Sequence, residues 1–207
     1  MTRILSFLFT TLAAIPVAVL AQAPPPAPPQ TPSQATASAP ASVSAQAAPA
    51  SANPISTSQS KLYTMLSGVV IAAAEKMPEE NYSFKPTPDV RNFGQLVGHL
   101  SDSQYFFCSS AAGETNHGSD AEKSKTSKAE LVAALRDAVA YCSKVHAGMT
   151  DAKGSEIMKM MNQDFARLTV LSANTAHDYE HYGNMVTYMR LKGIVPPTSE
   201  KGSQGHH

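Results

Sequence analysis

Apolar residues recur at intervals of three and four through four long segments of this 207-residue chain, whereas signals typical of β-strands are weak. The segments lie near residues 58–77, 88–112, 127–149 and 165–192. Such spacing places apolar side chains on one face of an α-helix, because a helix has about 3.6 residues per turn. No Asn-Gly or Asp-Gly hairpin turn is present. The predicted fold class is all-α, an up-and-down four-helix bundle with one long connection.

Residues with known positional preferences predict where the helices begin and end. Thr87 is a candidate N-cap for the second helix. Ser127 and Glu130 have the spacing of a capping box at the start of the third helix. Gly113 and Gly193 follow the second and last helices, where a left-handed residue commonly ends a helix.

Two segments between the predicted helices lack a clear helical pattern. Residues 113–126 are polar and form the long connection. Residues 150–164 are ambiguous and are predicted to contain a short helix near residues 157–161.

The first 21 residues are predicted to be a secretory signal peptide. Arg3 precedes an uncharged apolar run from Ile4 to Leu20, and small residues follow. An uncleaved membrane anchor is the alternative, but the run is at the short limit for a membrane span and contains Pro16. We therefore expect an exported protein, periplasmic or extracellular, with no membrane span in the mature chain.

The rest of the chain divides into a spacer, a folded domain and a tail. Residues 22–56 consist largely of Ala, Pro, Ser, Gln and Thr, which predicts a disordered spacer. Residues 57–200 have the size of one compact domain, and residues 201–207 form a polar tail that we predict to be disordered. No basic run is present, so nucleic acid is not an expected partner.

The two cysteines, Cys108 and Cys142, fall in the second and third predicted helices. An even number of cysteines in an exported protein favours a disulfide. Two buried thiols that never meet are the alternative. We predict a disulfide that joins the two helices across the long connection.

Three histidines are candidate ligands of a metal ion. His177 and His181 are four residues apart, so both rings lie on one side of the last helix and can point at one ion. A coincidental surface pair or a hydrogen-bonded core pair would have the same spacing. His99, in the second helix, is either a half-buried histidine bonded to a carbonyl or a third ligand. His146 falls between the apolar face of its helix and solvent, with no other candidate site residue nearby.

Residues 92–108 place one histidine on the second helix, and residues 176–197 contain a His-x-x-x-His pattern on the last. On the basis of these two segments, the region from about Tyr63 to Pro197 resembles the DinB-like superfamily of helical bundles, which includes candidate metalloenzymes. The resemblance implies that His99, His177 and His181 are the metal ligands.

Three histidine ligands leave a coordination position open, as in catalytic metal sites. The resemblance implies a metal-dependent enzyme that activates water or a thiol, for hydrolysis or transfer on a small molecule. It also implies a homodimer. Zinc and nickel are the expected ions, because both bind well to nitrogen ligands. The alternative function is a non-catalytic exported bundle that binds a metal or another ligand, and the sequence identifies no catalytic residue.

Four polar side chains near the histidines are candidates to support the site. Asp102 and Asn174 are each three residues from a histidine and could hydrogen-bond a ligand ring. Asn184 and Tyr188 could face its open side. The alternatives are a solvated charge for Asp102, a core polar group for Asn174 and packing for Tyr188.

Overall fold

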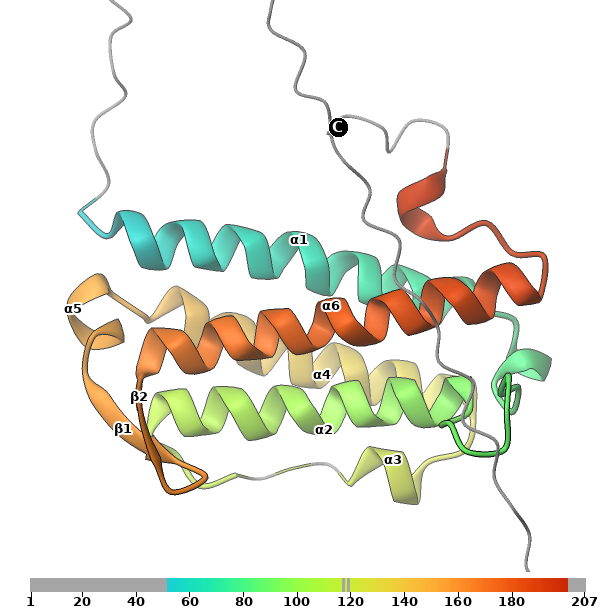
Figure 1. Ribbon diagram of the computed structural model, residues 1–207, viewed down its shortest axis with the longest axis horizontal. Helices are drawn as coiled ribbons and strands as arrows, with labels where there is room; N and C mark the ends of the chain where they lie inside the picture. The colour runs from blue at the N-terminus through green and yellow to red at the C-terminus, as the bar shows by residue number, and fades with distance from the viewer. Residues whose placement is uncertain (1–51, 117, 119, 201–207) are drawn as a thin grey trace, which may run out of the picture. The chain divides into compact units, whose positions relative to one another are not determined.

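Four long helices form a bundle in the computed structural model of this chain, which describes residues 52–116, 118 and 120–200 (Figure 1). They are α1 (Pro54–Lys76), α2 (Phe93–Ala112), α4 (Lys128–Ala147) and α6 (Arg167–Leu191). Helices α1 and α2 each pack against both α4 and α6. The predicted all-α four-helix fold class is confirmed.

The long connection between α2 and α4 allows α4 to run in the same direction as α2. It contains the short helix α3 (Ala121–Ser124), which packs along α2. Lys128, at the start of α4, donates to the backbone carbonyl of Glu75 near the end of α1. Helix α4 therefore runs in the same direction as α2, and α1 and α6 run opposite to them (Figure 1). The long connection thus breaks a strict alternation of direction.

Several predicted helix ends are present in the structure. The side chains and backbones of Ser127 and Glu130 form the reciprocal bonds of a capping box. Gly113 and Gly193 have φ angles of 80° and 72°, the left-handed conformation that glycine adopts without steric cost.

The predicted start of α2 at Thr87 is wrong. Asn92 is the N-cap and forms a capping box with Gln95. The first backbone amide of the helix, that of Phe93, donates to the carbonyl of Phe84 at 3.0 Å. The preceding loop therefore supplies an acceptor at this position, which helical periodicity alone does not reveal.

The short helix predicted near residues 157–161 is also wrong. Strands β1 (Ile157–Met160) and β2 (Gln163–Ala166) form an antiparallel hairpin instead. Met161 and Asn162 join them with φ angles of 51° and 62°. Two left-handed residues in succession match the twist of a tight hairpin, although the sequence lacks the usual glycine.

The described part of the chain starts just before α1. Helix α1 begins at Pro54, so the last residues of the predicted spacer are helical. Asp151, in the short helix α5 (Asp151–Gly154), accepts from the backbone amides of Ile55 and Ser56 at 3.2 and 2.7 Å. This carboxylate satisfies amides at the start of α1 that have no partner within the helix.

The predicted signal peptide, residues 22–51 of the spacer and the predicted tail lie outside the described residues. Among the described residues, no helix is long and apolar enough to span a bilayer. Two short 3-10 helices complete the fold, at Glu79–Asn81 and Pro197–Ser199.

The core of the bundle lies between the four long helices. Fully buried large side chains come from each of them, including Tyr63, Leu100, Leu135 and Met185. Burying a side chain such as leucine contributes about 1.5–3 kcal/mol. This core holds α2 and α6 against each other.

Candidate metal centre

The three candidate histidines meet at one point between α2 and α6. Nε2 of His99 lies 3.2 Å from Nε2 of His177, and Nε2 of His181 lies 3.1 Å from the same atom. The packing of the two helices therefore joins one ligand candidate from α2 to two from α6.

These distances fit a common metal ion. A tetrahedral ion with nitrogen ligands at about 2.0–2.1 Å separates two of those nitrogens by about 3.3 Å. Hydrogen bonds explain the arrangement less well, because Nε2 of His177 faces two rings and has only one proton or one lone pair in the ring plane. Nδ1 of His177 is buried with no partner among the described residues.

Burial keeps the two α6 histidines in the form that binds metal. Desolvation, followed by the nearby His181 and His99, lowers the pKa of His177 to about 4. Desolvation and then His99 also lower the pKa of His181. Both rings are therefore neutral at neutral pH, and a neutral imidazole is the form that binds a metal.

Glu122 contacts the cluster from the long connection. One of its carboxylate oxygens lies 3.1 Å from Nδ1 of His99, and the other accepts from Nε of Arg91 at 2.7 Å. A carboxylate at Nδ1 favours a proton on that nitrogen and leaves the Nε2 lone pair for an ion. Sequence reasoning missed Glu122, because it lies in the long connection, 23 residues from His99, where the sequence shows no helical periodicity.

Asp102 and Gly98 place Glu122. The Asp102 carboxylate accepts from the backbone amides of Ala121 and Glu122 at 2.8 and 3.1 Å, and so holds the start of α3 on α2. A Cβ atom at Gly98 would lie only 2.6 Å from Cα of Glu122, so this close approach requires glycine. Asp102 therefore supports the site through the segment that bears Glu122.

Two other predicted residues lie beside the cluster. Nδ2 of Asn184 is 3.3 Å from Nδ1 of His181. The Tyr188 hydroxyl donates to the backbone carbonyl of Arg91 at 2.8 Å, which connects the end of α6 to the residue that pairs with Glu122.

Two pockets flank the three histidines. The first, of about 490 Å³, is called the Phe106 pocket and is lined by His99, Asp102, Ser103, Phe106, Phe107, Asn116, Gly118, Asp120 and His177. The second, of about 740 Å³, is called the Arg91 pocket. It is lined by Lys85, Pro86, Thr87, Asp89, Val90, Arg91, Gln95, Leu96, Glu122, Glu180, His181, Asn184 and Tyr188. A small molecule can therefore approach the histidines from two sides.

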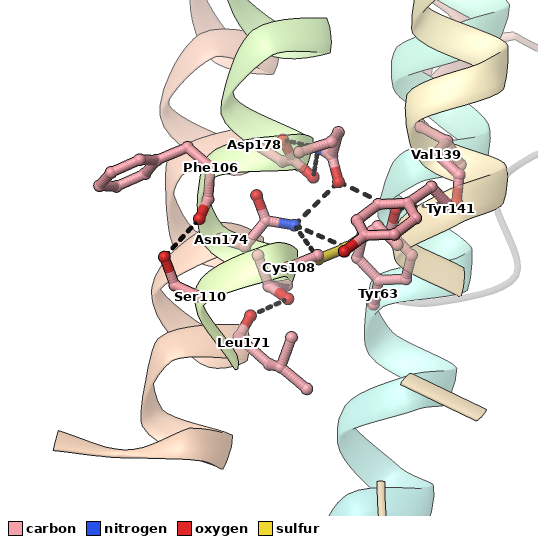
Figure 2. Close-up of a disulfide and its surroundings, with 12 residues drawn as sticks. Tyr63, Phe106, Cys108, Ser110, Val139, Tyr141, Leu171, Asn174 and Asp178 are labelled. Carbon is pink, nitrogen blue, oxygen red and sulfur yellow. Dashed lines mark hydrogen bonds between the residues drawn. A yellow bond between two sulfur atoms is a disulfide. The ribbon is translucent and has the colours of Figure 1, made fainter. Parts of the chain in front are cut away.

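The predicted cysteine pair lies in the core beside the fourth predicted support residue, Asn174 (Figure 2). The sulfur atoms of Cys108 and Cys142 lie at disulfide-bonding distance, with 5.3 Å between the Cα atoms. Nδ2 of Asn174 is 3.5 Å from the Cys142 sulfur and donates to Oε1 of Gln104 at 2.8 Å. The Asn174 amide is thus a core polar group, which differs from the predicted bond to a ligand ring.

His146 belongs to this second cluster, so its predicted position near solvent is wrong. The residue is 3% exposed, and its ring stacks on Tyr63 with 4.2 Å between centroids. Ligand atoms of Cys108, Cys142 and His146 lie within 4.8 Å of one another. A disulfide has no thiolate to offer a metal, so we assign no ion to this cluster.

A buried hydrogen-bond network connects the two clusters. Nε2 of Gln104 on α2 donates to both carboxylate oxygens of Asp178 on α6, at 2.7 and 2.9 Å. The Tyr63 hydroxyl from α1 donates to Oε1 of Gln104 at 2.9 Å. Because Asp178 is adjacent to His177, this network holds α6 in the register that brings His177 towards His99. Sequence reasoning did not identify it.

Comparison with known proteins relates the fold to a family. The sequence profile of the DinB superfamily matches residues 66–185, more than half of the chain. A crystal structure of a DinB-like protein from Bacillus cereus ATCC 10987 is similar, with a TM-score of 0.61 and 17% identity over 68% of this chain and 95% of that one. A DinB-like protein from Bacillus subtilis has a TM-score of 0.58 and 18% identity, over 70% of this chain and 99% of that one. Among curated proteins, none matches this sequence.

Proposed function

The chain belongs to the DinB superfamily, and on that premise we propose that it is a metal-dependent enzyme that acts on a small molecule. The resemblance seen in the sequence is thereby confirmed. The proposed ligands of a divalent ion are His99, His177 and His181. Zinc and nickel are the proposed ions, because both bind well to imidazole nitrogen.

The observation that supports this proposal best is the convergence of three Nε2 atoms from two helices. Two of them lie 3.1 and 3.2 Å from the third, which suits ligands of one ion. Three protein ligands leave at least one coordination position for a water or a substrate atom. The two adjacent pockets give a substrate access to that position.

When bound, a divalent ion at this site would supply the chemistry of a Lewis acid that activates water or a thiol. The protein's own contribution starts with Glu122, which holds the Nδ1 proton of His99 and so orients that ring. Arg91 in turn pairs with the Glu122 carboxylate and balances its charge. Burial keeps His177 and His181 neutral, and Phe106 and Phe107 give the first pocket an apolar wall.

We propose hydrolysis or thiol-dependent transfer as the class of reaction. Hydrolysis needs only water as the second reactant. Thiol-dependent transfer needs a small thiol, which is scarce outside the cytoplasm, so an exported protein is better suited to hydrolysis.

Export itself remains part of this proposal. The disulfide-distance cysteine pair is compatible with an oxidising compartment. N-terminal sequencing of the protein recovered from its host tests the predicted cleavage after Ala21, and an intact N-terminus on exported protein would contradict a cleaved signal peptide.

Elemental analysis of the purified full chain tests the proposed function. We expect a stoichiometric divalent metal in the wild-type chain and its loss in the His177→Ala variant. Metal content that this substitution leaves unchanged would refute the ligand assignment. With nickel bound, the relaxation of water protons reports whether the ion has an exchangeable water. Water-proton relaxation that the bound nickel does not speed up would instead support a non-catalytic binding protein.

A further inference from the structure

We infer that Arg91 recognises an oxyanion, a carboxylate or a phosphate group, on the molecule that binds beside the three histidines. The inference rests on the proposed function, because the ion is part of the electrostatic environment. It adds a class of substrate, small molecules with an oxyanion, and identifies Arg91 as the residue that determines this specificity.

Both the backbone and the side chain of Arg91 are anchored. Its carbonyl accepts from the Tyr188 hydroxyl at 2.8 Å, and its Nε donates to Glu122 at 2.7 Å. The side chain is 41% exposed. A guanidinium has five N–H donors, and only the one on Nε has a partner among the described residues. The remaining four, on the two terminal nitrogens, are held in a fixed plane at the Arg91 pocket.

Arg91 lies beside the histidine cluster. One carboxylate oxygen of Glu122 accepts from Nε of Arg91 at 2.7 Å, and the other lies 3.1 Å from Nδ1 of His99. Arg91 and His181 also line the same pocket, so one small molecule in that pocket can contact both the guanidinium and the ion.

The net charge of the site favours an anion. Three imidazole ligands contribute no negative charge to neutralise a divalent cation, and Glu122 compensates only the charge of Arg91. An oxyanion at the terminal nitrogens of Arg91 would gain from both positive groups. Lys85, Asp89 and Glu180 line the same pocket, so beyond the pair of Arg91 and Glu122 its lining has one positive and two negative side chains. This excess of negative charge disfavours a large polyanion and leaves a single oxyanion as the better fit.

The Phe106 pocket is a poorer site for this group. Its lining contains the carboxylates of Asp102 and Asp120 but no lysine or arginine. The difference in charge between the two pockets therefore assigns the oxyanion to the Arg91 side.

Calorimetric titration of the metal-loaded full chain with inorganic phosphate and, separately, with acetate tests the inference. Arg91→Gln should weaken the binding of the preferred anion by about 10- to 100-fold, the usual range for charge-assisted hydrogen bonds. Arg91→Lys should have a smaller effect, because lysine keeps the charge but lacks the planar fork. The matched control is Arg136→Gln, which removes another surface ion pair, with Glu75, and should leave the affinity unchanged.

Stronger binding of phosphate or of acetate decides which oxyanion the site prefers, and either result supports the inference. It is overturned if neither anion binds the metal-loaded chain, or if both bind Arg91→Gln as tightly as wild type. Elemental analysis of each protein separates the two proposals. A chain that holds its metal but shows no dependence on Arg91 refutes only the oxyanion, whereas a chain that holds no metal refutes both.

Discussion

The two histidine-containing clusters of this bundle differ in their access to solvent. The histidine cluster, His99, His177 and His181, adjoins two pockets. The cysteine cluster, formed by Cys108, Cys142 and His146, is sealed in the core, where both cysteines are 0% exposed. In each cluster, the potential ligand atoms of three side chains lie within 4.8 Å of one another.

This difference shows why residue type alone does not identify a functional site. His146 has the same imidazole as His177, and burial lowers the pKa of each to about 4. His146 stacks on Tyr63 and lies beside a cysteine pair whose sulfurs are at bonding distance, so its role is in packing. His177 faces two further imidazoles and lines a pocket.

The largest expected effect comes from replacing a histidine by alanine in each of the two clusters in turn. His181→Ala should weaken metal binding by at least about 1000-fold, because a binding free energy of about 10–16 kcal/mol is shared among few ligands. His146→Ala should keep the metal but reduce the free energy of unfolding by about 2 kcal/mol. Metal titration and urea unfolding measure both quantities. Loss of metal from His146→Ala would contradict the assignment of metal binding to the histidine cluster alone.

Removing the cysteine pair should affect stability alone. A disulfide that closes a 34-residue separation contributes about 4 kcal/mol in the chain-entropy model. We therefore expect a reducing agent to lower the free energy of unfolding of the wild type. The double variant Cys108→Ala/Cys142→Ala is the control, and it should unfold identically with and without the reductant. Two free thiols in the folded, air-oxidised protein would contradict the pairing.

Acid should destabilise the protein through His146. Burial depresses the pKa of this residue from 6.5 to about 4, so between these values the unfolded chain binds a proton that the folded chain does not. Stability should therefore fall as the pH decreases through this window, by at most about 3 kcal/mol.

The His146→Phe variant isolates this contribution, because phenylalanine can still stack on Tyr63 but does not titrate. Urea unfolding of the metal-free proteins at several pH values should show a shallower pH dependence for the variant. Equal slopes for both proteins would show that His146 does not titrate differently on folding.

The smallest expected effect is on metal affinity and comes from Glu122, which contacts the histidine cluster. Glu122→Gln removes the carboxylate at Nδ1 of His99 and should reduce metal affinity by about 10- to 100-fold, the usual cost of losing such a partner. Glu130→Gln, in the capping box of α4, is the control, because its carboxylate bonds to Ser127 and lines neither pocket beside the histidines, so it should leave affinity unchanged. Equal metal affinity in wild type and Glu122→Gln would refute the orienting role.

Features that depend on residues close along the chain were predictable from the sequence. Periodicity predicted the four helices, and the capping box of Ser127 and Glu130 predicted the start of α4. The start of α2 was not predictable in this way, because an amide at its first turn bonds to the carbonyl of Phe84 in the preceding loop. The hairpin was missed because its left-handed turn at Met161 and Asn162 lacks the usual glycine.

The candidate site likewise contains residues that the sequence identified and residues that it did not. The spacing of His177 and His181 placed two rings on one side of a helix, and the family pattern added His99. Glu122 and Arg91 had no such signal, since both lie outside the long helices and act through side chains distant in sequence.

By itself, the sequence determined the helical fold, several helix ends and the pairing of His177 with His181 on one side of a helix, because periodicity, capping and a repeated turn are interactions between residues close along the chain. Only the tertiary structure decided which polar side chains meet. The packing of α2 against α6 brought the histidines together, the close contact at Gly98 put Glu122 beside His99, and the burial of α4 sealed His146 in the core. These outcomes depend on how separate helices pack, and local spacing contains no information about that.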